Sequence, residues 1–243
     1  YSEGVAKASI PHNVHIHTES KFTTEQLHEL QPALRSSQKR PHAMTVVSPV
    51  KGMNFIMVEL DSLEDLAKVT TSGVKPRAKL DEGWDTGFIG SYFYVVMPQV
   101  GQQPDTTGHQ IRTRMIEGAL EDAATGSAAC GLCAYLSLEG RLNDRLFLIT
   151  QGVEMGRKSE IGVAVTLTED FGAIDKIELS GSAVKVMEGT VYYDWFIQSY
   201  PVHQRITIHA WATFIFLTPV VQYCYERAAQ SEDNGALHSS MIQ

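Results

Sequence analysis

Hydrophobic and polar residues alternate along much of this chain, in short segments separated by turn residues. Alternation with a period of two is typical of strands that bury one face. Because short strands outnumber helices and do not alternate regularly with them, the pattern predicts an α+β fold rather than a doubly wound parallel sheet. The predicted strands are residues 5–17, 44–50, 55–60, 91–97, 111–116, 146–150, 161–168, 176–179 and 183–187, with 190–193 as an extension.

Helical signals occur in fewer places. The predicted helices are residues 23–34, 62–69 and an apolar run, 128–138. Thr23 and Gln26 have the spacing of a capping box, and Asp61 and Glu64 open the second helix in the same way. The third helix is apolar on nearly every side, so it must be buried on every side. The simplest way to bury it is a mostly antiparallel sheet curled around it.

The residues just before the apolar helix carry the candidate chemistry. Asp122, Thr125, Gly126 and Ser127 lie where backbone N–H groups and the positive end of the helix dipole suit a substrate carboxylate. Gly126 lacks the Cβ that would block close approach. An ionised Asp122 could move protons, and the Ser127 hydroxyl could bond the substrate. The alternative is that Asp122 or Thr125 is only a helix cap, with the small residues needed for packing.

Composition narrows the function classes. The chain has 243 residues, enough for one large or two smaller domains, and the polar connector 35–42 marks a boundary. A net charge of −8 opposes binding to nucleic acid or anionic membranes. Three cysteines cannot form a disulfide framework, and no signal-like segment opens the chain, so we expect a cytoplasmic protein.

Both ends of the sequence are unusual. The chain begins at Tyr1 without an initiator Met, which suggests a piece of something longer. Residues 206–221 are apolar but interrupted and too short for a confident membrane span, so no membrane partner is expected. We expect residues 196–243 to form an atypical, poorly ordered tail.

Weaker constellations have plainer explanations. The Cys-x-x-Cys pair Cys130 and Cys133 could be a redox motif, but its place inside the apolar helix favours core packing. Of three neighbouring histidines, His12, His15 and His17, the last two share a strand face and could ligate a metal, yet no third ligand is placed by spacing. Edge-strand or surface histidines are the favoured interpretation.

Two charged groups are also ambiguous. Arg157 could bind an acidic substrate or pair with a neighbouring glutamate, and the residues do not decide between the two. The residues around Asp81, from Lys79 to Asp85, are interpreted as a solvated loop.

The run from Arg112 to Ala129 closely resembles the Asp-Pro-Ala-Thr-Gly-Ser-Ala signature of the PhzF-like family of phenazine biosynthesis, with Ala123 where most members have Pro. Segments beginning at Gln151 and Ser180 resemble further blocks of that family. The resemblance implies a diaminopimelate-epimerase-like fold. Such a fold has two similar domains, each a curled sheet around a central helix, with the active site in the cleft between them.

The same resemblance implies an isomerase that shifts a proton between substrate carbons without metal or organic cofactor. Asp122 and Ser127 would assist catalysis, while Gly126 and its neighbours Thr125 and Ala128 would hold the carboxylate of a small-molecule substrate. A homodimer is compatible with this picture.

In the family, the general base is a glutamate from the N-terminal domain, accompanied by a Gly-His-Pro segment, and residues 1–45 contain no match. We therefore expect a truncated chain, with residues 1–43 a remnant of that domain and its crossover helix, and 44–195 the complete C-terminal domain. Two other hypotheses remain open: an inactive fragment that only binds anions, and a thiol redox protein.

Overall fold

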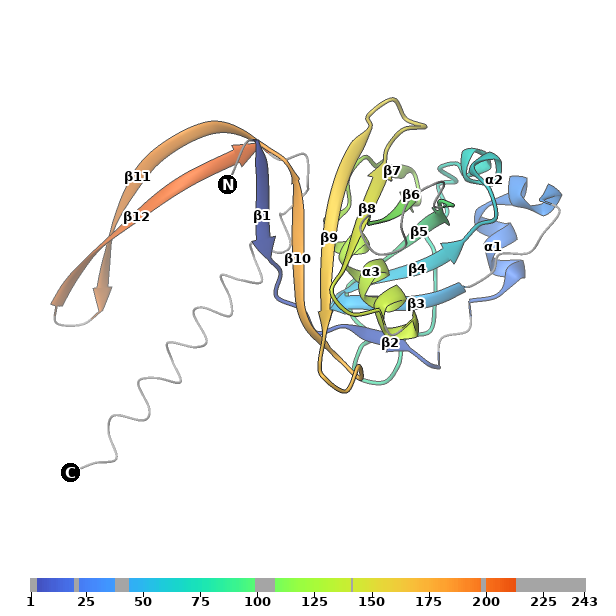
Figure 1. Ribbon diagram of the computed structural model, residues 1–243, viewed down its shortest axis with the longest axis horizontal. Coiled ribbons are helices and arrows are strands. Elements are labelled where there is room, and N and C mark those ends of the chain that lie inside the picture. The colour runs from blue at the N-terminus through green and yellow to red at the C-terminus, as the bar shows by residue number, and fades with distance from the viewer. Residues whose placement is uncertain are drawn as a thin grey trace.

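A curled sheet with one helix inside it dominates the computed structural model (Figure 1). The structure describes residues 4–19, 22–37, 44–98, 108–140, 142–197 and 200–212. The 27 of these residues that lie from position 184 onward are described by their backbone alone. The part of the predicted tail beyond residue 212 lies outside these residues.

The main sheet has ten strands and is mostly antiparallel. In spatial order they are β1 (Val5–Ser9), β10 (Ile174–Ser182), β9 (Ser159–Leu167), β8 (Arg145–Gln151), β6 (His109–Glu117), β5 (Phe88–Val96), β4 (Met53–Glu59), β3 (Met44–Val50) and β2 (His15–His17), with β7 (Leu120–Asp122) paired to β6 alone. Only the β4–β5 and β6–β8 neighbours run parallel. This mixed sheet confirms the α+β class.

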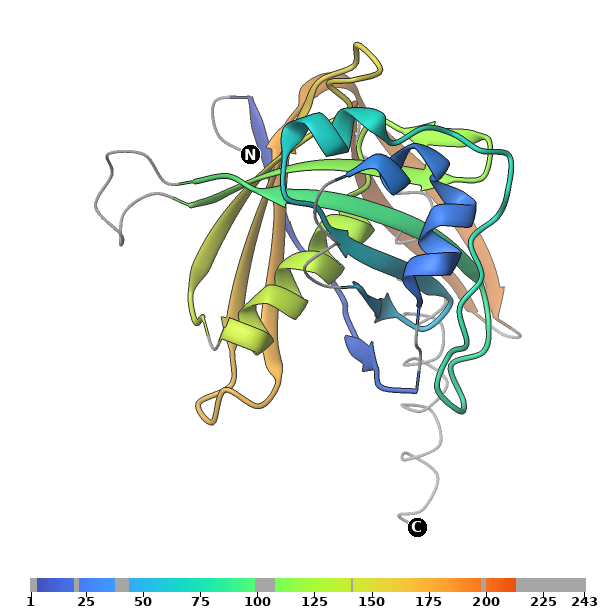
Figure 2. The same ribbon diagram turned by 90° about the vertical axis from the view of Figure 1, so that its right-hand side faces the viewer.

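Helices cover both faces of the sheet (Figure 2). The helix inside the curl is α3 (Gly126–Gly140), and the outer face carries α1 (Thr24–Leu30), the short 3-10 helix η1 (Pro32–Ser36) and α2 (Leu63–Lys68). Strand alternation explains the two cores, since Phe55 and Met57 of β4 pack toward α3 whereas Ile56 and Val58 pack toward the outer helices.

Burial of α3 confirms the prediction from its composition. Ala129, Leu132 and Cys133 are completely buried, and even the polar Ser137 has no exposed surface. The helix contacts strands from both ends of the sheet, β9 and β10 on one side and β3 and β4 on the other. The curl therefore places the N-terminus of α3 between two sheet edges.

Of the two predicted helix starts, one is confirmed and the other is wrong. Thr23 and Gln26 form both hydrogen bonds of a capping box at α1. The α-helix ends at Leu30 rather than at residue 34, because Pro32 disfavours helical geometry in the residue before it. At α2 the cap is not Asp61 but Ser62, whose extended backbone lets its hydroxyl accept from the N–H of Asp65.

The predicted single strand at residues 5–17 is wrong in an informative way. It divides into β1 and β2, which pair with opposite edges of the sheet, β10 and β3. Residues 10–14, the crossing segment, span the gap between these edges. The N–H of Ile10 donates to Ile177 O and that of Asn13 to Pro49 O, each at 2.9 Å. Pro11 cannot extend a ladder between them because it has no N–H.

The chain continues from β10 into an antiparallel hairpin of β11 (Val184–Ile197) and β12 (Tyr200–Ala212). This hairpin projects away from the main sheet (Figure 1). Within the described part of the chain, no helix is long and apolar enough to span a membrane.

Candidate active site

The start of α3 is unusual because its cap residue turns its side chain away from the helix. The carbonyl of Thr125 accepts the first helical hydrogen bond, from Ala129 N at 3.0 Å. Its hydroxyl instead donates to Asp122 Oδ2 at 2.7 Å. Thr125 is therefore a backbone cap whose side chain serves a neighbouring polar cluster.

Three backbone donors remain at this helix end. Gly126, Ser127 and Ala128 occupy the first turn, where N–H groups have no partner within the helix. Among the described residues, no hydrogen-bond acceptor is assigned to these three N–H groups. Together with the positive end of the helix dipole, they form a site suited to an anion.

Gln151, the last residue of β8, holds this helix start in place. Its Nε2 donates to the carbonyl of Asp122 at 2.8 Å and to Thr125 Oγ1 at 2.9 Å. Its Oε1 accepts from the hydroxyl of Tyr92 at 3.1 Å and from the N–H of Thr125 at 3.3 Å. Because Gln151 is completely buried, every one of these bonds replaces water that the amide has lost.

The turn after Gln151 requires glycine. Gly152 has a φ of +76°, and a Cβ there would lie 2.4 Å from Arg157 O and 2.9 Å from Ala123 O. The Gln-Gly pair of the sequence block thus has a physical basis. The amide positions the helix start, and the glycine lets the backbone pass close to it.

A small pocket lies at the N-terminus of α3. Gly126 and Ser127 line it together with Cys130, Met53 and His12 of the crossing segment. Its volume of about 20 Å³ holds roughly one water molecule. The crossing segment therefore nearly closes the helix end from solvent.

His12 and Cys130 are the titratable side chains among the described residues that line this pocket. Burial raises the pKa of the Cys130 thiol to about 12, so the thiol stays protonated at neutral pH. His12 is half-buried, and histidine is the side chain used most often in general acid–base catalysis. Of the two, His12 is the group able to take part in acid–base chemistry.

The structure separates the predicted site residues into two groups. Ser127 and Gly126 face the pocket, whereas Asp122 and Thr125 belong to the polar cluster beside it. The methyl group of Ala128 is buried in the core, so only its N–H could contact a ligand.

Sequence reasoning missed His12 as a pocket residue because it was grouped with His15 and His17. The available signal was Pro11, which interrupts the strand next to His12 and so indicates that His12 lies outside the strand of the other two histidines.

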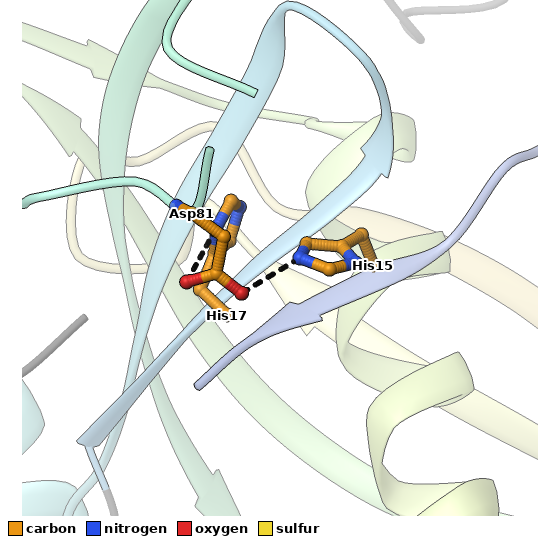
Figure 3. A group of neighbouring side chains, drawn as sticks. All are labelled: His15, His17 and Asp81. Atoms are coloured by element: carbon orange, nitrogen blue, oxygen red, sulfur yellow. Dashed lines mark hydrogen bonds and ion pairs between the residues drawn. The ribbon is translucent and has the colours of Figure 1, made fainter. Parts of the chain in front are cut away.

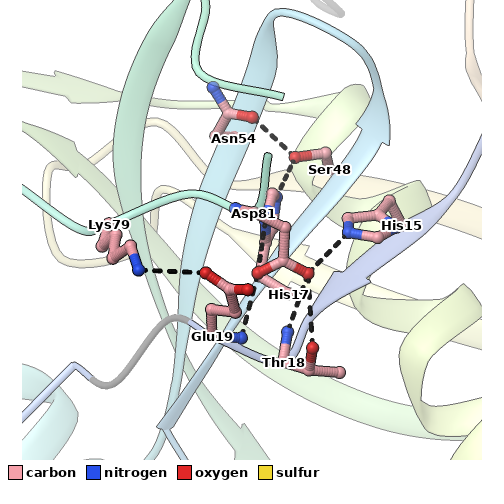
Figure 4. A network of polar contacts seen from close by, with 8 residues as sticks. All are labelled: His15, His17, Thr18, Glu19, Ser48, Asn54, Lys79 and Asp81. Carbon is pink, nitrogen blue, oxygen red and sulfur yellow. Dashed lines mark hydrogen bonds and ion pairs between the residues drawn. The ribbon is translucent and has the colours of Figure 1, made fainter. Parts of the chain in front are cut away.

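The other two histidines lie on the opposite face of the sheet, where Asp81 joins them (Figure 4). His15 Nε2 lies 2.9 Å from Asp81 Oδ2, and the N–H groups of Thr18 and Glu19 donate to the same carboxylate. The interpretation of Asp81 as part of a solvated loop is therefore wrong. Its partners are 60 to 70 positions away in sequence, so local charge patterning could not reveal them.

The two remaining motifs have structural explanations. Cys130 and Cys133 are both buried free cysteines in the core around α3, as the packing interpretation predicted. Of the glutamates near Arg157, Glu154 pairs with Arg112 and Glu160 pairs with Lys158, each at 2.7 Å.

Comparisons with known proteins agree on one family. The sequence profile described as phenazine biosynthesis-like protein, PhzC-PhzF, matches residues 2–189. The trans-2,3-dihydro-3-hydroxyanthranilate isomerase of Pseudomonas chlororaphis is 36% identical over 88 residues, which cover 35% of this chain and 31% of that enzyme.

A solved structure shows the same fold. The crystal structure of the Bacillus anthracis phenazine biosynthesis protein of the PhzF family superposes with a TM-score of 0.52 at 14% identity, covering 85% of this chain and 61% of that one. The chain thus spans less than two thirds of the length of either relative.

Proposed function

The chain belongs to the PhzC-PhzF family of phenazine biosynthesis-like proteins, and from that premise we propose that it acts as a PhzF-like isomerase on a small metabolite that carries a carboxylate. The reaction would be an acid–base proton transfer between substrate carbons, without a metal or organic cofactor. The N-terminus of α3 carries this proposal, because the side chain of its cap residue Thr125 turns away from the N–H groups of the first turn. We further propose that the curled sheet around α3 is one of two similar domains of a diaminopimelate-epimerase-like fold.

Carboxylate binding follows from the backbone of the first helical turn. The N–H groups of Gly126, Ser127 and Ala128 point out of the helix end, where the dipole favours negative charge. Gly126 presents no side chain to a ligand, and the hydroxyl of Ser127 adds a donor at the pocket. A carboxylate held there would place the adjacent substrate carbons next to Ser127 and His12.

Proton transfer is assigned to the polar groups around that position. Asp122 accepts from the N–H of Ala124 at 3.3 Å and from Thr125, which leaves further lone pairs on its oxygens. Ser127 and Asp122 would assist the transfer as the family resemblance implies, and His12 is an additional candidate to carry the proton. As the family resemblance implies, the principal base would be a glutamate of an N-terminal domain, and the residues around the start of α3 would supply the other half of the site.

Substrate entry requires the pocket to enlarge. Small-molecule sites commonly have volumes of about 300–1,000 Å³, whereas the space at the helix end is about 20 Å³. The crossing segment forms the cover, so it must move away from Ser127 when a metabolite binds.

A second candidate function is anion binding without turnover. It is favoured by the pocket lining, since no carboxylate side chain of the described residues lines the pocket and could act as a strong base there. The helix N-terminus would still hold a carboxylate in that case.

The deciding experiment combines turnover and binding on the whole 243-residue chain. Trans-2,3-dihydro-3-hydroxyanthranilate is incubated in D2O, and NMR follows deuterium entering carbon positions and the appearance of an isomer. Calorimetry with small aromatic carboxylates runs in parallel. Turnover that Ser127→Ala reduces supports the isomerase, and binding without turnover supports the second candidate. If neither binding nor turnover is detected, both candidate functions are contradicted.

A further inference from the structure

A compact group of metal-ligating side chains lies outside the candidate active site (Figure 3). His15 and His17 come from β2, and Asp81 comes from the long loop between α2 and β5. Ile16 packs into the core around α3, so the two histidines point to the opposite face of the sheet. The group is therefore separate from the N-terminus of α3.

The ligand atoms of the three residues are close together. His15 Nε2 lies 2.9 Å from Asp81 Oδ2, and His17 Nδ1 lies 3.6 Å from Asp81 Oδ1. One atom from each residue can be chosen so that all three lie within 4.8 Å of one another. Zinc ligands at about 2.0–2.2 Å from a tetrahedral ion lie roughly 3.3–3.5 Å apart, so small side-chain movements suffice.

A chain of hydrogen bonds fixes the tautomer of His17. Its Nε2 donates to Ser48 Oγ at 2.8 Å, and that hydroxyl donates to Asn54 Oδ1 at 2.6 Å. The amide of Asn54 is anchored in turn by donating to two backbone carbonyls at 2.9 Å. Nδ1 of His17 accepts the N–H of Asp81 at 3.0 Å, so the lone pair faces the aspartate. Histidines that bind metals are oriented by second hydrogen bonds of this kind.

The protonation states also suit a cation. Burial lowers the pKa of His17, and the neighbouring His15 lowers it further, which keeps this imidazole neutral. Burial opposes ionisation of Asp81, but hydrogen bonds from Thr18, Glu19 and His15 hold its pKa well below the usual range. Neutral imidazoles and an ionised carboxylate are the forms that bind metal ions.

We propose that His15, His17 and Asp81 form a binding site for a divalent transition-metal ion of the zinc type, with water completing the coordination. Two imidazoles and a carboxylate favour zinc and its neighbours over magnesium or calcium, which prefer oxygen ligands. The ion replaces the hydrogen bond between Asp81 N–H and His17 Nδ1, and this exchange limits the affinity.

The site has a structural consequence. Asp81 lies 66 positions after His15 in sequence, so a bound ion cross-links the loop before β5 to the edge strand β2. An ion that binds only the folded chain raises its stability by mass action. The metal does not contact the candidate active site and takes no part in the proposed reaction.

Calorimetric titration of the metal-free chain with ZnCl2 at neutral pH tests the site. We expect saturable binding of one ion per chain, weakened at least about tenfold in His15→Ala and in Asp81→Asn. His12→Ala and His109→Ala are matched controls that remove a histidine elsewhere and should bind as the wild type. Circular dichroism verifies that each variant is folded.

A second readout uses Trp84, whose ring stacks on His15 with centroids 4.5 Å apart. Comparison with Trp84→Phe isolates the fluorescence of Trp84. Cu²⁺ should quench this fluorescence in the wild type, and the quenching should be lost in His15→Ala. Zinc should raise the unfolding temperature of the wild type but not of His15→Ala. No saturable zinc binding, or binding that His15→Ala and Asp81→Asn leave unchanged, would overturn the proposal.

Discussion

Thr125 begins α3 with its backbone and binds Asp122 with its side chain, the hydroxyl lying 2.7 Å from Asp122 Oδ2. A threonine at this position ordinarily turns its oxygen toward the N–H groups of the first turn. Here the aspartate holds that oxygen away from them. The donors at the helix end are left for a ligand, which links a local capping choice to the proposed chemistry.

Removal of the polar groups at this helix end should impair the reaction. Ser127→Ala removes a hydroxyl at the pocket, and Asp122→Asn keeps an acceptor for Thr125 while removing the charge. We expect each to lower turnover by about 10²-fold or more, measured as the initial rate of isomer formation. Ser137→Ala alters a serine of the same helix away from the pocket and should retain turnover. Full activity in both site variants would show that the assigned roles are wrong.

Gln151→Leu should destabilise the fold because it removes hydrogen bonds from several buried partners. Tyr92 loses an acceptor, and Thr125 loses both an acceptor for its N–H and a donor to its hydroxyl. We expect the free energy of unfolding in urea to fall by at least about 2 kcal/mol. Gln110→Leu, at an exposed position of β6, is the matched control, with an effect within about 0.5 kcal/mol.

Arg114 should matter more to stability than Arg112, although both point to the same face of β6. Arg114 is 6% exposed, forms two 2.7 Å bonds with Glu121, and donates to carbonyls at the end of α2. Arg114→Met leaves the carboxylate of Glu121 without its ion-pair partner, so the free energy of unfolding should fall by about 3–5 kcal/mol. Arg112→Met removes the more exposed ion pair with Glu154 and should lower the free energy of unfolding by at most about 1 kcal/mol.

A double variant separates the ion pair from general packing. Arg114→Met combined with Glu121→Met removes both charges, so it should be more stable than Arg114→Met alone. Equal stabilities of the single and double variants would mean that the unpaired carboxylate of Glu121 is not the cause of the lost stability.

Acid should weaken the fold through His17 and Asp81. The folded chain resists protonation of His17, whose pKa burial lowers, whereas the unfolded imidazole protonates near pH 6.5. The free energy of unfolding should therefore fall as the pH drops below about 6.5. The lowered pKa of Asp81 adds a further loss below the pKa of an unfolded aspartate, about 3.9.

Urea unfolding from pH 7.5 to pH 4 with a chelator present measures the part of this dependence that arises from His17. The groups that face His17 are His15, Asp81, Ser48 and the ring of Trp84. His17→Gln should flatten the profile between pH 7 and pH 5, whereas His28→Gln should keep the wild-type slope. A wild-type slope in His17→Gln would contradict this assignment.

The cysteines of α3 should be inert in the folded chain. Burial raises the pKa of Cys130 to about 12 and that of Cys133 well above its usual value, so neither forms a reactive thiolate. Iodoacetamide at pH 8 should leave both unmodified until guanidinium unfolds the chain, as peptide mass spectrometry would show. Rapid alkylation under native conditions would favour a thiol redox function instead.

Local pattern was enough to predict the elements whose cause is local. The strand at Met44–Val50, the capping box at Thr23 and the buried helix after Thr125 all follow from nearby residues. The motif before α3 also indicated the helix end that lies at the pocket. The hub residue Gln151 could not be assigned its role, because its partners come from β5, β7 and the start of α3.

The sequence pattern could not predict which segments far apart in the chain pair with one another. Alternation alone joined residues 5–17 into one strand, while the choice of partner edges divides it at Pro11. The joining of Asp81 to His15 likewise depends on where a long loop returns to the sheet. Both cases require the order of strands, which periodicity does not contain.

The pairing of β1 with β10 also orders events during synthesis. Val5 pairs with Ser182, so β1 must wait for about 175 further residues to be synthesised before its partner is present. At 5–20 residues per second, that interval is roughly 9–35 s. Until then the crossing segment has only one anchored end, at β2. The cover over α3 can thus be completed only late, after the helix and the strands that contact it have been synthesised.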